Sequence, residues 1–183
     1  MEIRITDDIK YIGVDDTTLD LFESQYVIPD GVSYNSYVIL DEKVAVIDTV
    51  DEYKLSEWEE KLIHELDGRT VDYLIIQHLE PDHTGGIVHM IEMFPEVVLV
   101  GNKKTFLFLK QYIEMKEHWN TLEVSDRDML DLGVHNLTFL MATMVHWPEV
   151  MVTFDATDKV LFSADAFGKF GALSLTADEE WAC

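Results

Sequence analysis

The chain has 183 residues, of which 48% are hydrophobic and 27% charged, and its formal net charge is −23 at pH 7. These values are typical of one folded domain with a sizeable core. A surface this acidic repels phosphate groups, so we expect neither nucleic acid nor an anionic membrane as a partner, although a protein with a basic face stays possible.

The chain shows no sign of secretion or of membrane insertion. Its single cysteine is Cys183, so no internal disulfide can form, which fits a reducing compartment. Residues 1–8 have neither the basic start nor the apolar core of a signal peptide. No apolar run approaches the roughly 20 residues that span a bilayer. We therefore expect a cytoplasmic protein.

Short apolar runs alternate with helical patterns along the first two thirds of the chain. Apolar residues at helical spacing predict helices, and short apolar runs between turn signals predict strands. Residues 41–43 read as the turn of a hairpin. In chain order we expect strands at 3–5, 9–13, 34–40, 44–48, 71–76 and 97–100, and helices at 54–66, 85–94 and 103–115.

The pattern changes after Trp119, where only strand-like segments follow. They lie at residues 122–124, 128–132, 137–141, 150–154 and 160–162. Residues 177–183 show no clear element. Helices and strands in this arrangement predict a mixed α/β layered fold in a single domain, not a regular βαβ alternation.

The most informative segment, His78-Leu79-Glu80-Pro81-Asp82-His83, has four side chains able to bind a metal within six residues. It follows an apolar strand, and α/β proteins usually place their sites at the carboxyl ends of strands. Neighbouring Asp82 and His83 leave the backbone in different directions, which suits two metal ions better than one. We therefore predict metal binding by His78, Glu80, Asp82 and His83.

Two further candidates follow later strand-like segments. His146 comes after residues 139–145, and Asp165 after residues 160–164. Alone, His146 would more often be a packed or capping histidine, and Asp165 could cap a following turn. Strand ends that converge on one edge would bring both side chains to the cluster, where a metal would compensate buried carboxylates.

Several other residues have a simpler structural interpretation. Trp147, next to His146, is expected to pack at the rim of the fold, with a role in electron transfer as the alternative. The helix-face aromatics and methionines are expected in the core. Four histidines lie outside any such cluster of potential ligands and are interpreted as structural or solvated: His64, His89, His118 and His135.

With these residues, the chain resembles the metallo-β-lactamase superfold, whose hydrolases carry His-x-His-x-Asp-His after a strand. Here Glu80 replaces the second histidine, which is similar to the flavodiiron proteins, also called A-type flavoproteins. Four more segments agree in the family's order: residues 31–37, 47–50, 146–149 and 162–168. The resemblance implies that residues 1–183 are an α/β, metallo-β-lactamase-like αββα sandwich, the N-terminal portion of a diiron domain.

The same resemblance implies the metal ligands. His78, Glu80 and His146 would bind one iron, Asp82 and His83 the second, and Asp165 would bridge the two. The donor chemistry agrees, because carboxylates and imidazoles without thiolates suit iron or manganese better than a structural zinc. The implied cofactor is a pair of iron ions.

The family reduces dioxygen to water, nitric oxide to nitrous oxide, or both. Its electrons come from FMN in a flavodoxin-like domain, and its head-to-tail dimer brings that flavin beside the diiron site of the other subunit. The resemblance therefore implies a flavin-bearing donor, flavodoxin-like or rubredoxin-linked. It also implies a homo-oligomer or a complex with a completing chain.

The chain departs from the family at its carboxyl end. It stops 18 residues after Asp165 (183 minus 165), and residues 166–183 contain no histidine for the family's seventh ligand and no flavodoxin-like segment. We expect a sandwich incomplete at its C-terminal end, with FMN supplied only by a partner chain or a missing domain. A split subunit, a truncated product and a self-completing variant are all compatible with this.

Three functions stay open from the sequence. The first is a diiron oxidoreductase module that reduces dioxygen or nitric oxide with electrons from a flavin partner. The second is a metal-dependent hydrolase of the same superfold, whose metal-bound water is the nucleophile, although Glu80 argues against it. The third is a non-catalytic metal-binding or interaction subunit, or an inert fragment.

Overall fold

The computed structural model describes residues 5–22, 24–168 and 170–176. Its largest element is a six-stranded sheet with the strand order β1-β6-β7-β8-β9-β10. The strands β7, β8, β9 and β10 run parallel, while β1 and β6 join antiparallel at one side. The six strands are β1 (Ile9–Tyr11), β6 (Tyr37–Leu40), β7 (Val44–Ile47), β8 (Tyr73–Ile75), β9 (Val98–Asn102) and β10 (Asn120–Val124).

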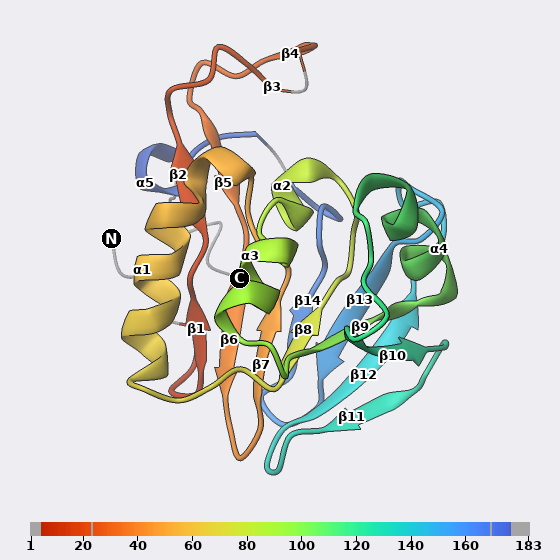
Figure 1. The fold of residues 1–183 in the computed structure, drawn as a ribbon. Coiled ribbons are helices and arrows are strands. Elements are labelled where there is room, and N and C mark those ends of the chain that lie inside the picture. The colour runs from red at the N-terminus through yellow and green to blue at the C-terminus, as the bar shows by residue number, and fades with distance from the viewer. Residues whose placement is uncertain (1–4, 23, 169, 177–183) are drawn as a thin grey trace.

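A second sheet of four antiparallel strands has the order β11-β12-β13-β14. These strands are β11 (Met129–Asp131), β12 (Asn136–Met141), β13 (Met151–Asp155) and β14 (Val160–Phe162). Two small ribbons complete the strands: β2 (Val14–Asp16) with β5 (Val32–Tyr34), and β3 (Leu21–Phe22) with β4 (Tyr26–Val27). The β3–β4 ribbon projects from the upper end of the molecule (Figure 1).

Helices cover the face of the large sheet turned away from the second sheet (Figure 1). Three of them, α1, α3 and α4, contribute buried side chains to that face. The helices are η1 (Glu52–Lys54), α1 (Leu55–Leu66), α2 (Pro81–Thr84), α3 (Ile87–Met93), α4 (Lys103–Tyr112) and α5 (Leu173–Thr176). Within the described residues, none is long and apolar enough to cross a membrane.

Strand alternation divides the core into two layers. On β7, Val44 and Val46 pack among the helices, while Ala45 and Ile47 face the second sheet. This is the two-residue period of a strand, here with both faces buried, as expected for a parallel sheet between two layers. Burial on both faces explains why this stretch reads as a continuous apolar run.

Most predicted elements are present, and the largest error concerns residues 34–40. Instead of one strand, β5 ends at Tyr34 and β6 begins at Tyr37, and the two strands pair with different partners. The break lies at Ser36, whose carbonyl accepts from Ile12 and whose hydroxyl donates to the carbonyl of Asp48. Ser36 therefore connects the strand break to the end of β7.

Smaller differences occur at other boundaries. The helix expected at 85–94 is preceded by the short α2, which begins at Pro81, a favourable first helical residue because it has no N–H to leave unpaired. The helix expected at 103–115 ends at Tyr112. Ile5 lies outside any strand. Ile3 and the tail 177–183 lie outside the described residues.

The turn after α2 depends on glycine. A Cβ atom on Gly85 would lie 2.5 Å from the backbone nitrogen of Glu52 and 2.7 Å from the carbonyl oxygen of Val50. Real side chains do not pack that closely, so only glycine lets this backbone approach the segment after β7. The close approach holds α2 against the end of the large sheet.

Candidate metal centre

The six predicted ligands converge at one end of the sandwich. His78 follows β8, Glu80 directly precedes α2, and Asp82 and His83 lie within α2. His146 lies in the loop between β12 and β13, and Asp165 follows β14. Figure 1 places α2 at the upper end of the molecule, beyond β8. Residues up to 87 positions apart (165 minus 78) thus meet at one site.

Four of the six side chains form a compact group. His78, Glu80, His146 and Asp165 each place one potential ligand atom within 4.8 Å of the other three. The Nε2 atom of His146 lies 3.4 Å from Oε2 of Glu80 and 3.3 Å from Oδ2 of Asp165. Two imidazoles and two carboxylates at this spacing can surround one cation.

Asp165 connects this group to the remaining two residues. Its Oδ2 atom faces Nε2 of His146, while its Oδ1 atom lies 2.7 Å from Nε2 of His83. Asp82 stands beside that second position, with Oδ2 3.8 Å from Nε2 of His83. One carboxylate thus contacts both halves of the cluster, an arrangement suited to bridging two cations.

An unpaired buried atom indicates that the group fits a metal. Nε2 of His78 lies 3.3 Å from Glu80 and 3.5 Å from Asp165, yet it makes no hydrogen bond. A buried polar atom without a partner is costly, and a cation at this point would compensate it. The imidazole and carboxylate donors suit iron or manganese, so the residues fit the expected metals.

The electrostatics of the site also favour cations. Burial disfavours charge on His78, but its hydrogen bond with Glu149 and the nearby carboxylate of Glu80 outweigh burial and raise its pKa to about 9. Burial raises the pKa of Asp82. Burial also opposes ionisation of Asp165, yet the hydrogen bond with His83 dominates and holds the pKa of Asp165 well below its usual range. The positive charge of the protonated imidazoles balances the negative charge of the carboxylates, and metal binding would displace these protons.

Two buried carboxylates form hydrogen bonds with the Nδ1 atoms of two of these histidines. Oε1 of Glu149 lies 2.9 Å from Nδ1 of His78, and Oδ2 of Asp48 lies 3.2 Å from Nδ1 of His83. Sequence reasoning assigned neither residue a role. A signal was present for Asp48, since a carboxylate ends the fully apolar run of β7 at the edge that also bears His78. Glu149 ends the family-like segment 146–149, but only the tertiary structure brings it to His78.

Trp147 packs against the site. Its ring lies edge-on to His78, with centroids 5.4 Å apart and an interplanar angle of 89°. Its side chain also contacts the core between the helices and the large sheet. Packing at the rim is therefore observed, while its part in electron transfer stays a prediction.

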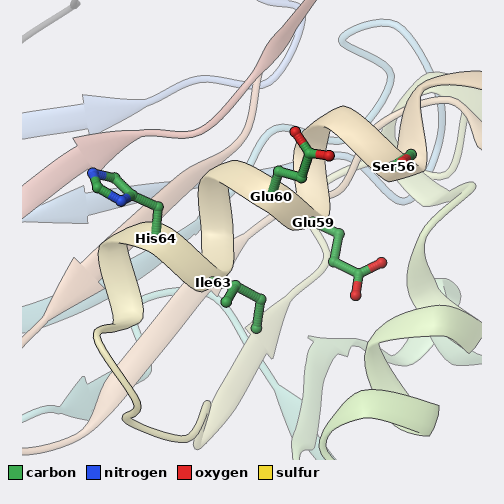
Figure 2. Close-up of a pocket in the computed structure, with 5 residues that line it drawn as sticks. All are labelled: Ser56, Glu59, Glu60, Ile63 and His64. Atoms are coloured by element: carbon green, nitrogen blue, oxygen red, sulfur yellow. The ribbon is translucent and has the colours of Figure 1, made fainter.

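The other four histidines lie apart from this group. His118 is exposed, and His89 pairs with Glu59 at 2.8 Å. His64 is exposed on α1, beside a hollow whose lining residues all belong to that helix (Figure 2). His135, despite its lack of acidic neighbours in the sequence, is buried and contacts Asp155.

The chain matches known proteins along most of its length. The family described as "ODP family beta lactamase" matches residues 32–181. A flavorubredoxin of Pectobacterium atrosepticum, named an anaerobic nitric oxide reductase, is 35% identical over 171 residues, which cover 92% of this chain and 33% of that protein. A protein named putative diflavin flavoprotein from a Nostoc strain is 31% identical, over 98% of this chain and 31% of its own length.

Solved structures agree with these sequence matches. The rubredoxin oxygen:oxidoreductase of Desulfovibrio gigas superposes with a TM-score of 0.88 at 32% identity, covering 94% of this chain and 43% of that one. The flavodiiron protein of Giardia intestinalis gives a TM-score of 0.87 at 30% identity, covering 94% and 42%. The predicted metallo-β-lactamase-like α/β fold and the resemblance to flavodiiron proteins are confirmed. The chain spans less than half of the length of each of these relatives.

Proposed function

The chain belongs to the ODP family of β-lactamase-like proteins, and we propose that it is a diiron oxidoreductase module that reduces dioxygen, nitric oxide or both. The observation that carries this proposal is the position of Asp165, whose two carboxylate oxygens face two separate groups of potential ligands. The printed names of relatives, a nitric oxide reductase and an oxygen oxidoreductase, support the choice of substrates.

In this proposal, His78, Glu80 and His146 hold the first iron, and Asp82 and His83 hold the second, with Asp165 shared. Bound iron would supply electrons and open coordination positions to a diatomic substrate. The carboxylates of Glu80, Asp82 and Asp165 reduce the repulsion between two nearby cations. Asp48 and Glu149 form hydrogen bonds with the two buried imidazole rings.

Small substrates have a route to the site. The side chain of His146 is 55% exposed and that of Asp165 35% exposed, while His78 is almost completely buried. The centre is therefore closed on the core side and accessible from the loops that carry His146 and Asp165. Trp147 shields one edge of His78, which limits water at the ligand that lies deepest.

The electrons are proposed to come from FMN held outside these residues, on a flavodoxin-like domain or a partner chain. The hollow on α1 does not suit the flavin phosphate, because Glu59 and Glu60 line it and would repel an anion (Figure 2). We propose a flavodoxin-like or rubredoxin-linked donor, within a homo-oligomer or a complex with a completing chain. A cytoplasmic location is part of the same proposal.

Anaerobic loading with Fe(II) tests the proposal. The loaded chain is mixed with a reduced flavoprotein, and consumption of nitric oxide and of dioxygen is followed with electrodes. We expect about two irons per chain and turnover that is lost in Asp165→Asn. Full loading without turnover, across flavodoxin-type and rubredoxin-type donors, would reject the redox function.

The same preparation separates the alternatives. Zinc-dependent hydrolysis of a thioester or phosphoester, lost in His78→Ala, would instead identify a hydrolase of this superfold. Absence of metal after loading would identify a non-catalytic fragment or subunit. Glu80 favours the redox function over the hydrolase, because hydrolases of the superfold carry a histidine at this position.

A further inference from the structure

Glu149 has contacts that distinguish it from the other acidic residues near the site. It is completely buried and accepts two hydrogen bonds on Oε1, one with Nδ1 of His78 at 2.9 Å and one from the backbone N–H of Leu79 at 3.1 Å. The peptide N–H of Leu79 can only donate. The position of Oε1 is therefore defined independently of the imidazole ring.

This geometry determines which nitrogen of His78 bears a proton in the neutral ring. A carboxylate oxygen accepts, so Nδ1 must donate to it, and Nε2 is left with its lone pair. Nε2 is the atom that lies between Glu80 and Asp165 without a hydrogen bond. The proton is thus on the side of the ring away from the metal site.

The backbone of Glu149 is itself held by distant elements. Its carbonyl oxygen accepts from the side-chain amide of Asn102, which also caps α4 by accepting from the N–H groups of Lys104 and Thr105. Met151, two residues later, donates to the carbonyl of Gln77, next to His78. The junction of β9 and α4 and the start of β13 therefore fix Glu149 relative to His78.

His146 provides a contrast. Its ring packs edge-on against those of His78 and Trp147. Among the described residues, however, its only polar contacts are those of Nε2 with Asp165 and Glu80, and more than half of its side chain is exposed. The protein thus defines the orientation of His78 before any ligand arrives, and leaves that of His146 less constrained.

We propose that Glu149 is a positioning residue for the metal centre: it holds His78 in the tautomer with the proton on Nδ1 and directs Nε2 between Glu80 and Asp165. The inference rests on the proposed function only in requiring that the site bind a metal. Hydrogen-bonded partners of this kind raise metal affinity, because less ordering of the ligand remains to be done on binding.

Three variants of Glu149 distinguish the effect of its hydrogen bonds on metal binding from the effect of its packing. Glu149→Met keeps the volume of the side chain and removes the acceptor. Glu149→Gln keeps both the volume and an oxygen that can accept from His78 and Leu79. Glu149→Asp keeps the charge and retracts it by one methylene, and it serves as the deciding variant if Glu149→Met does not fold.

The matched control is Glu59→Met. Glu59 also pairs with a histidine, His89, at 2.8 Å, but the pair lies on α1 and α3 away from the candidate ligands. It tests whether removing any glutamate–histidine pair changes metal binding.

The measurements use Zn²⁺ as a diamagnetic probe. Zinc affinity is obtained by competition with a chelator, and long-range ¹H–¹⁵N spectra of the zinc-loaded chain report the proton on Nδ1 of His78. We expect roughly 10–100-fold weaker zinc binding in Glu149→Met and Glu149→Asp. We also expect loss of the hydrogen-bonded Nδ1 proton signal in both, recovery of signal and most of the affinity in Glu149→Gln, and no change in Glu59→Met.

Wild-type affinity together with an unchanged Nδ1 signal in Glu149→Met, or in Glu149→Asp if Glu149→Met is unfolded, would overturn the assignment. An equal loss in Glu59→Met would overturn it as well. These readouts need no turnover. The zinc affinities and Nδ1 signals could behave as expected while the iron-loaded wild type reduces neither dioxygen nor nitric oxide. In that case the proposed function would fail and the role of Glu149 would stand.

Discussion

Nε2 of His83 lies 2.7 Å from Oδ1 of Asp165, although 82 positions separate the two residues in the chain. The other oxygen of the same carboxylate faces His146 at 3.3 Å. This division of one carboxylate between two histidines is the geometric basis for a two-metal centre. It also makes Asp165 the side chain whose loss should affect both positions.

Asp165→Asn is expected to lower the metal content from about two ions per chain to one or fewer. The amide keeps the size of the side chain but loses the negative charge that offsets the repulsion between two cations. Metal analysis after anaerobic loading and desalting measures the change. Asp67→Asn is a suitable control, because Asp67 is exposed and has the left-handed backbone that asparagine tolerates. Two retained ions in Asp165→Asn would contradict the bridging position.

Glu80→His is expected to shift metal preference toward zinc. The substitution replaces a hard oxygen donor by an imidazole and produces the His-x-His-x-Asp-His pattern of the hydrolases. With Fe(II) and Zn(II) competing anaerobically, we expect the bound zinc-to-iron ratio to rise roughly tenfold over wild type, or about 1.4 kcal/mol in relative binding free energy. Glu80→Gln controls for simple loss of charge, since it should weaken both metals without this shift. An unchanged ratio would remove Glu80 as the determinant of metal choice.

His135 is expected to make the stability of the chain depend on pH. Burial opposes its charged form, but the hydrogen bond and charge of Asp155, with Asp41 and Asp158 nearby, dominate and raise its pKa above the usual value of about 6.5. Nε2 of the same ring also lies 3.7 Å from Asp8. Because the pKa is higher in the folded state, this stabilisation is fully present below pH ~6.5 and is lost as pH rises through the folded-state value.

Urea unfolding of the metal-free chain at several pH values measures this effect. His135→Gln should cost about 1.5–3 kcal/mol at pH 6, the range for hydrogen bonds to charged groups. The cost should shrink as pH rises. His118→Gln, at an exposed position, should show no such trend. An equal cost of His135→Gln at pH 6 and at pH 9 would argue against a charged pair.

Trp58→Phe is expected to destabilise the fold by about 1–3 kcal/mol, because it leaves a small cavity and removes one buried hydrogen bond. Trp58 is fully buried and donates from Nε1 to the hydroxyl of Ser36 at 3.0 Å, and that hydroxyl donates to the carbonyl of Asp48 at 2.8 Å. Chemical denaturation measures the loss. Trp119→Phe, at a partly buried position, should cost less. If the two variants cost the same, the buried link from α1 to Asp48 adds no stability.

Local pattern was enough to predict most of the elements. The continuous apolar run of β7 and the helical spacing of α1 were recognised because burial of an element produces an apolar pattern among residues that are close in the sequence. The split between β5 and β6 was missed, because Ser36 breaks the strand through bonds to Ile12 and Asp48, which lie elsewhere in the chain. The β3–β4 ribbon was missed as well, since two-residue strands carry too little pattern to recognise.

The sequence by itself determined the kind of chemistry. Four potential ligands within residues 78–83, with glutamate at the second position, specify donor types and a strand end regardless of how the chain folds. Only the tertiary structure decided how these donors are shared, because the orientation of an imidazole depends on what contacts its other nitrogen. Glu149 reaches His78 across 71 positions, and Asp165 lies between His83 and His146. Such contacts come from the packing of two sheets, and no local pattern encodes them.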